Sequence, residues 1–130
     1  MLTSAPLWQA TSAVPMYVQV SDTFAGGYEF YDGTPPEPTV ASGEITATPV
    51  GGTAPYTYAW TEVDHSPTFP YPCGATTTDP TSATTHWTFT QASPGDWVVQ
   101  GYYKCTVTDS AGSPAVVDSV EVEVILEQST

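Results

Sequence analysis

Acid–base chemistry in this 130-residue chain would have to come from two histidines and fourteen acidic residues. Asp64, His65 and Ser66 bring together the three side-chain types of a hydrolytic triad, but they are consecutive in the sequence. A triad is a spatial arrangement, and neighbours along one segment do not form a proton relay. His86 alternates out of phase with Trp87 and Phe89, so we expect it on the solvent-facing side of a strand. The sequence therefore predicts no catalytic residue and no enzymatic activity.

Four aspartates lie in predicted turns, where carboxylates could bind calcium: Asp22, Asp32, Asp96 and Asp109. The Asp-x-Asp-x-Asp-Gly spacing of a calcium-binding loop does not occur. Aspartate is also common in turns for a simpler reason, because its side chain accepts hydrogen bonds from nearby backbone N–H groups. We expect turn formation, with calcium binding as the alternative, and we predict no metal-binding or cofactor-binding residue.

Aromatic side chains are the third group of candidates, and they would act by contact. Clusters of exposed aromatic residues mark protein interfaces or platforms for stacking sugars. A small domain cannot bury all the aromatic residues that this chain places outside its periodic segments. The predicted partner-contacting residues, for which internal packing is the alternative, are Trp8, Tyr28, Phe30, Tyr31, Phe69 and Tyr71.

The elements that must position these residues are β-strands. Thirteen prolines and ten glycines are spread along the chain and argue against long helices. Alternation of apolar and polar residues with a period of two predicts strands, within residues 15–21, 44–50, 56–63, 84–91, 97–108 and 116–126. Residues 22–38 and 64–80 are turn-rich and are expected to be loops. In the last strand, Val120, Val122, Val124 and Leu126 are expected to face the core.

The charge balance excludes some partners. Fourteen acidic residues and one basic residue, Lys104, give a formal charge of −13. Binding to nucleic acid or to an anionic membrane needs lysine and arginine, so we predict neither. Residues 1–14 lack the basic start and apolar run of a secretory signal, so we expect a cytoplasmic protein or a mature fragment.

Three motifs resemble those of immunoglobulin-like and PKD-type domains, and they occur in the expected order across residues 41–126. The stretch from Gly51 to Trp60 (GGTAPYTYAW) resembles their central strand, and the stretch from Cys105 to Gly112 (CTVTDSAG) resembles their closing hairpin. The stretch from Pro80 to Thr85 (PTSATT) is similar to the segment before the fifth strand in domains of tailed-phage structural proteins.

The resemblance implies an all-β, immunoglobulin-like sandwich of about seven strands. Residues 41–127 would form it, and residues 1–40 would be a loosely structured arm and a first edge strand. Trp60 would be the core tryptophan, Tyr103 would occupy a tyrosine corner, and Cys105 would take the place of the second sandwich cysteine. No cysteine stands opposite it, so we expect Cys73 and Cys105 to be unpaired, with Cys73 reactive. The predicted core residues are Trp60, Trp87, Phe89, Tyr103 and Cys105.

The function that the resemblance implies is structural. We expect a phage virion protein, assembled in the host cytoplasm, that decorates the capsid or tail at the virion surface. Its expected partners are a capsid or tail protein, copies of itself, or a host surface glycan. The alternatives are a carbohydrate-binding module that uses exposed aromatic residues, and a fragment of a secreted bacterial adhesin.

Overall fold

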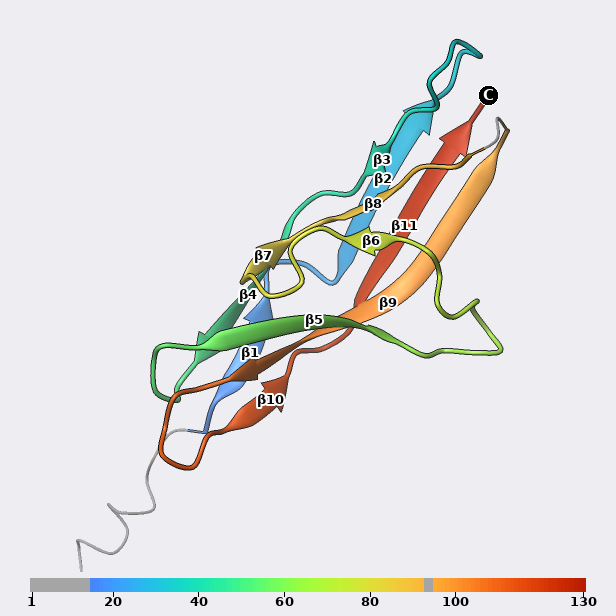
Figure 1. The fold of residues 1–130 in the computed structure, drawn as a ribbon. Helices are drawn as coiled ribbons and strands as arrows, with labels where there is room; N and C mark the ends of the chain where they lie inside the picture. Colours follow the sequence, from blue (N-terminus) through green and yellow to red (C-terminus); the bar gives the residue numbers. More distant parts are fainter. Residues whose placement is uncertain (1–14, 93–94) are drawn as a thin grey trace, which may run out of the picture.

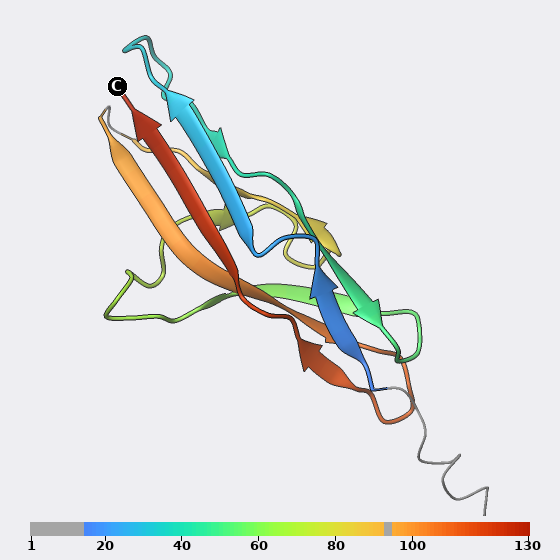
Figure 2. The ribbon, with the colours of Figure 1, turned by 180° about the vertical axis from the view of Figure 1, so that it is seen from behind.

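The computed structural model describes residues 15–92 and 95–130. Every regular element in these residues is a β-strand, and the predicted all-β class is confirmed. The strands form two layers of an elongated β-sandwich (Figures 1 and 2). None of the described residues belongs to a helix long and apolar enough to cross a membrane. Trp8 and the rest of the predicted arm, residues 1–14, lie outside the described residues.

The first layer is organised around β9 (Trp97–Thr108), the longest strand. On one side, β9 pairs with β5 (Thr57–Val63). On its other side it pairs with β10 (Val116–Asp118) along one half and with β11 (Val122–Ser129) along the other half. The strand β2 (Phe24–Phe30) then pairs with β11 in parallel.

The second layer consists of shorter strands. Here β4 (Ile45–Val50) lies between β1 (Tyr17–Val20) and β7 (Thr84–Thr85), and β8 (Trp87–Phe89) lies between β3 (Val40–Ala41) and β6 (Thr76–Thr77). The two groups are consecutive in the chain, since only His86 separates β7 from β8. A hydrogen bond from the backbone N–H of Ser42 to the carbonyl of Trp87 extends the pairing of β3 with β8.

The core between the layers contains a cluster of aromatic rings. The ring of Trp87 is fully buried, 5.7 Å from the ring of Trp60 and 5.1 Å from that of Tyr103. Cys105 is also fully buried, whereas Phe89 is partly buried and packs edge-on against Trp97. Paired aromatic rings in such geometries contribute beyond the area they bury.

One expected loop is a strand. Residues 22–38 contain β2, and its residues Gly26 and Gly27 do not form a turn. A Cβ atom at Gly27 would overlap the carbonyl of Ala41, so the glycine allows β2 to approach β3 closely. Because β1 pairs with β4 and β2 pairs with β11, the described residues before 40 take part in both layers.

The last expected strand is divided in two, and the prediction that Val120 faces the core is wrong. Val120 is 61% exposed, and Ser119 is buried instead. The Ser119 hydroxyl accepts a hydrogen bond from the backbone N–H of Cys105 and donates one to the carbonyl of Val120. These bonds hold Ser119 inward between β10 and β11, so the alternation of buried and exposed residues shifts there by one position, as it does at a β-bulge. Val122, Val124 and Leu126 face the core.

Candidate contact surface

The outer face of the layer formed by β2, β11 and β9 carries exposed apolar side chains. The strand register places Phe24 beside Glu123 and Tyr28 beside Glu127. On the opposite side of β11, Val98 of β9 is paired with Glu127. Phe24, Tyr28, Phe30 and Val98 are 47%, 55%, 62% and 62% exposed. We refer to these four residues together with the half-buried Ile125 as the outer-face patch.

The alternation of β2 explains why its large side chains point outward. Ala25 is buried against the core, and Phe24, Tyr28 and Phe30 lie on the opposite face. At Gly26 an added Cβ would lie 2.7 Å from the edge of the Phe24 ring. The ring therefore lies along the strand, over the glycine.

Two shallow hollows flank Tyr28. One, of about 400 Å³, is lined by Phe24, Gly26, Ile125 and their neighbours. The other, of about 360 Å³, includes Val98. Tyr28 and Glu127 border both hollows. The Tyr28 hydroxyl lies 2.5 Å from Oγ of Ser129, so the ring between the hollows is held at its tip.

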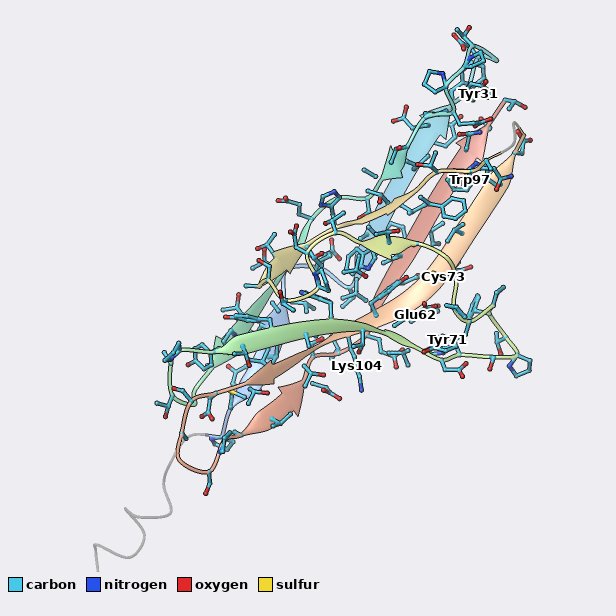
Figure 3. All side chains as sticks on the ribbon, viewed as in Figure 1. Tyr31, Glu62, Tyr71, Cys73, Trp97 and Lys104 are labelled. Atoms are coloured by element: carbon cyan, nitrogen blue, oxygen red, sulfur yellow. The ribbon has the colours of Figure 1, made fainter. Side chains whose placement is uncertain are left out.

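Acidic side chains surround the patch. Glu123 accepts hydrogen bonds from Nε2 of Gln100 at 2.6 Å and from the Tyr102 hydroxyl at 3.1 Å. Loss of solvent is the main cause that raises the pKa of the Tyr102 hydroxyl, and the hydrogen bond to Glu123 raises it further. Glu127 is exposed and lies beside Tyr28. Lys104, which lies farther along β9 (Figure 3), donates to Asp118 at 2.8 Å and does not neutralise them.

The predicted residue Phe69 lies on this same face. Its ring is 5.3 Å from that of Tyr102, and the ring of His65 is 4.4 Å from Tyr102. Nε2 of His65 lies 2.7 Å from Oε1 of Glu121. Tyr71, in the same loop, is 48% exposed (Figure 3).

The loop that carries Phe69 and Tyr71 is anchored by Cys73. The Cys73 backbone N–H donates to Oε2 of Glu62 at 2.9 Å, and its Sγ lies 3.0 Å from the Tyr103 hydroxyl. Burial raises the pKa of the Cys73 thiol and raises that of the Tyr103 hydroxyl further. Neither Cys73 nor Cys105 forms a disulfide.

Tyr31 differs from the expectation of an exposed aromatic residue. It is only 6% exposed, because it follows β2 at the end of the sandwich where the C-terminal strand also ends (Figure 3). Its backbone N–H donates to the carbonyl of Ser129. Loss of solvent, with smaller effects of Glu37 and Asp32, raises its pKa. Of the predicted contact residues, Tyr28 and Phe30 therefore share the patch, and Tyr31 does not.

The turn aspartates bind backbone groups. Oδ1 of Asp22 accepts from the N–H of Thr23, and Oδ1 of Asp32 accepts from the N–H of Thr34. Asp109 accepts from three backbone N–H groups, and these bonds hold its pKa below the usual range. Across residues 15–92 and 95–130, no three His, Cys, Asp or Glu side chains are grouped so that they could hold a metal ion.

Sequence reasoning missed Phe24, Val98 and Ile125 as surface residues. For Val98 in β9 and Ile125 in β11 the signal was present, since both residues are out of phase with the buried positions of their strands. In β2 the two consecutive glycines hid the alternation. Only the pairing of β2 with β11 brings the three residues onto one face.

Comparisons with known proteins cover parts of the chain. Residues 40–64, which include β3, β4 and β5, match the SprB repeat family. A 66-residue stretch is 46% identical to a protein of Escherichia phage T5 called "Decoration protein". This stretch covers 51% of the chain and 31% of the phage T5 protein, so the chain spans about a third of that relative's length. The chain is thus similar to the SprB repeat within its central strands and to a phage decoration protein over half its length.

Proposed function

We propose that this protein is a non-enzymatic structural protein of a tailed phage, which decorates the surface of the virion with an immunoglobulin-like domain. The observation that carries the proposal is the 46% identity to the decoration protein of Escherichia phage T5. Identity of this level over 66 residues favours a common fold and a related role for the matched part. The capsid is the proposed attachment site, and the tail is the alternative.

The strand order supports the immunoglobulin-like assignment. The first described strand, β1, lies in one layer, and the chain then crosses to the other layer as β2, which pairs in parallel with the last described strand, β11. The strand β5 pairs with β9 along its whole length, and Trp60 on β5 packs against Trp87 of the other layer. A buried tryptophan on the strand in this position is typical of this class of sandwich.

The proposal is tested with particles of the encoding phage that were assembled without the protein. We expect purified protein to sediment with these particles and to saturate at a fixed number of copies per particle. Electron microscopy of the complex would then show density on the capsid or on the tail. Failure to bind saturably to either structure would contradict the proposed function.

A second candidate function is carbohydrate binding. It is favoured by the exposed rings of Phe24, Tyr28 and Phe30 on one face of β2, because such rings stack on the apolar faces of sugars. We expect binding on a glycan array that is lost in Tyr28→Ala if this function exists. An array without signal at high protein concentration would remove the candidate.

A further inference from the structure

We propose that the outer-face patch is the surface that docks on the virion, and that the partner offers an apolar centre bordered by lysine and arginine side chains. The inference rests on the proposed function and adds to it the docking face and the chemistry of the partner surface. Its occupant is a protein of the virion shell and not a second copy of this chain.

The first argument is the concentration of apolar side chains in one place. Phe24, Tyr28, Phe30 and Val98 are all about half exposed or more, and they lie on β2 and β9, the two strands that flank β11. The other large exposed apolar residues lie on other elements: Tyr71 in the loop before Cys73, Tyr17 on β1 of the second layer, Val116 on β10, and Val120 between β10 and β11. Single exposed apolar residues need no explanation, whereas a contiguous patch marks a site of interaction.

The second argument is that the patch is preorganised. Its side chains project from strands whose register is held by continuous pairing from Phe24 to Phe30 along β11. The Phe24 ring is seated over Gly26, and the Tyr28 hydroxyl is bonded to Ser129. Aromatic side chains on rigid strands lose little conformational freedom when they bind, which favours their use as anchors of an interface.

The third argument is charge, and it decides the occupant. Glu123 and the exposed Glu127 border the patch beside Phe24 and Tyr28, and the chain's one basic side chain, Lys104, is paired with Asp118. A second copy with a net charge of −13 would bring further carboxylates and no free cation. Residues 1–14 contain no lysine or arginine and cannot supply one either. A partner with basic side chains around an apolar centre complements both features of the face.

The test compares two triple variants in the particle-binding assay. Phe24→Ser, Tyr28→Ser and Phe30→Ser together remove the patch aromatics of β2, and Tyr17→Ser, Val116→Ser and Val120→Ser together remove similarly exposed residues elsewhere. We expect the patch variant to bind about thirtyfold more weakly or worse, since central aromatic residues dominate interfaces. The control variant should bind as the parent does.

The charge argument has its own matched pair. Glu127→Gln and Glu44→Gln each remove one exposed carboxylate, so their net charges are equal and only the position differs. We expect Glu127→Gln to weaken binding by about two- to fivefold at low salt, because contacts at the rim of an interface are modest. Glu44→Gln should have no effect. Equal binding by these two variants would contradict the inference that basic side chains border the partner surface.

The remaining outcomes separate the two proposals. If the parent binds particles and the patch variant binds equally well, the docking face is wrong and the proposed function stands. If the parent itself does not bind, both fall. Thermal melting checks that each variant is folded. If the triple variant of the patch does not fold, the double variant Phe30→Ser and Val98→Thr provides the same test. Both side chains are 62% exposed, so their replacement removes little packing.

Discussion

At the scale of single residues, two adjacent glycines of β2 serve different purposes. An added Cβ at Gly26 meets only the far end of the Phe24 ring, whereas at Gly27 it meets the backbone carbonyl of Ala41. A side chain can rotate away at small cost, but a backbone carbonyl in a paired strand cannot. The close approach of β2 to β3 therefore depends on Gly27 alone.

We expect Gly26→Ala to fold with nearly the stability of the parent and Gly27→Ala to lower the melting temperature clearly. The reason is that a methyl group in place of the Gly27 hydrogen would force β2 and β3 apart and weaken the contact between the two layers. Thermal unfolding of the two variants side by side measures the difference. Equal melting temperatures would show that β2 does not lie this close to β3.

The two thiols should both react more slowly than a free cysteine. Cys73 is half-buried with a raised pKa, and burial raises the pKa of Cys105 to about 11, so little thiolate is present in either case. At about pH 8 we expect slow labelling of Cys73 by a thiol reagent, no labelling of Cys105, and rapid labelling of both after denaturation. Rapid labelling of Cys73 in the native protein would mean that the loop carrying Cys73 does not pack against Tyr103.

At the scale of elements, Trp60 joins β5, which is paired with β9 in the first layer, to the second layer. Its ring packs against Trp87, and its Nε1 donates to the carbonyl of Ser82 at 2.9 Å. We expect Trp60→Ala to lower the free energy of unfolding by about 3–5 kcal/mol through the cavity it leaves. Denaturant unfolding provides the measurement, and exposed Thr61→Ala on the same strand is the control.

The end of the sandwich formed by two turns depends on Asp109. Its carboxylate accepts from the N–H of Thr53 in one turn and from those of Ala111 and Ala115 in the other. These bonds favour the ionised form and lower its pKa in the folded protein. The stabilisation is therefore present above the pKa of the unfolded chain, about 3.9, and is lost as the pH falls through the lower folded value.

We expect Asp109→Asn to melt below the parent at neutral pH and the difference to shrink as the solution is acidified below about pH 4. The amide keeps the shape of the side chain but gives up the charge and one of the two accepting oxygens. Oδ2 of Asp109 accepts from Thr53, and Oδ1 accepts from Ala111 and Ala115, so the amide NH2 would face at least one N–H that it cannot accept from. Melting temperatures of both proteins across the acidic range provide the measurement. A difference that does not change with pH would contradict the role of the charge.

At the scale of the whole molecule, the net charge of −13 on 130 residues opposes the compact state. The ion pair between Lys104 and Asp118 neutralises little of this charge. Repulsion between exposed carboxylates opposes the association of copies of the protein in solution. The same repulsion destabilises each folded copy.

We expect the melting temperature to rise between about 20 mM and 500 mM sodium chloride, because the Debye length falls from roughly 20 Å to about 4 Å. Calorimetry at a series of salt concentrations, with a neutral osmolyte as the control, measures the effect. A melting temperature that is constant or falls with salt would show that repulsion contributes little.

Much of the architecture follows from local patterns. Alternation identifies β5 and β9, and it places Trp60, Trp87 and Tyr103 on buried faces because a strand turns every second side chain to the same side. Such a pattern needs no knowledge of what the strand packs against. For the same reason the sequence predicts only part of the contact surface. It indicates Tyr28 and Phe30, as aromatic residues outside the periodic segments, but not Phe24 or Val98.

The sequence by itself determined the all-β class, most of the strands and the aromatic core, because these depend on residues close together in the chain. Only the tertiary structure decided that Gly26 and Gly27 belong to a strand, that Ser119 replaces Val120 in the core, and that Tyr31 is buried. These outcomes depend on distant partners, such as Tyr28 and Ser129, which lie 101 positions apart. Periodicity carries no information about which strands will become neighbours. The outer-face patch exists because β2 and β11 pair with each other.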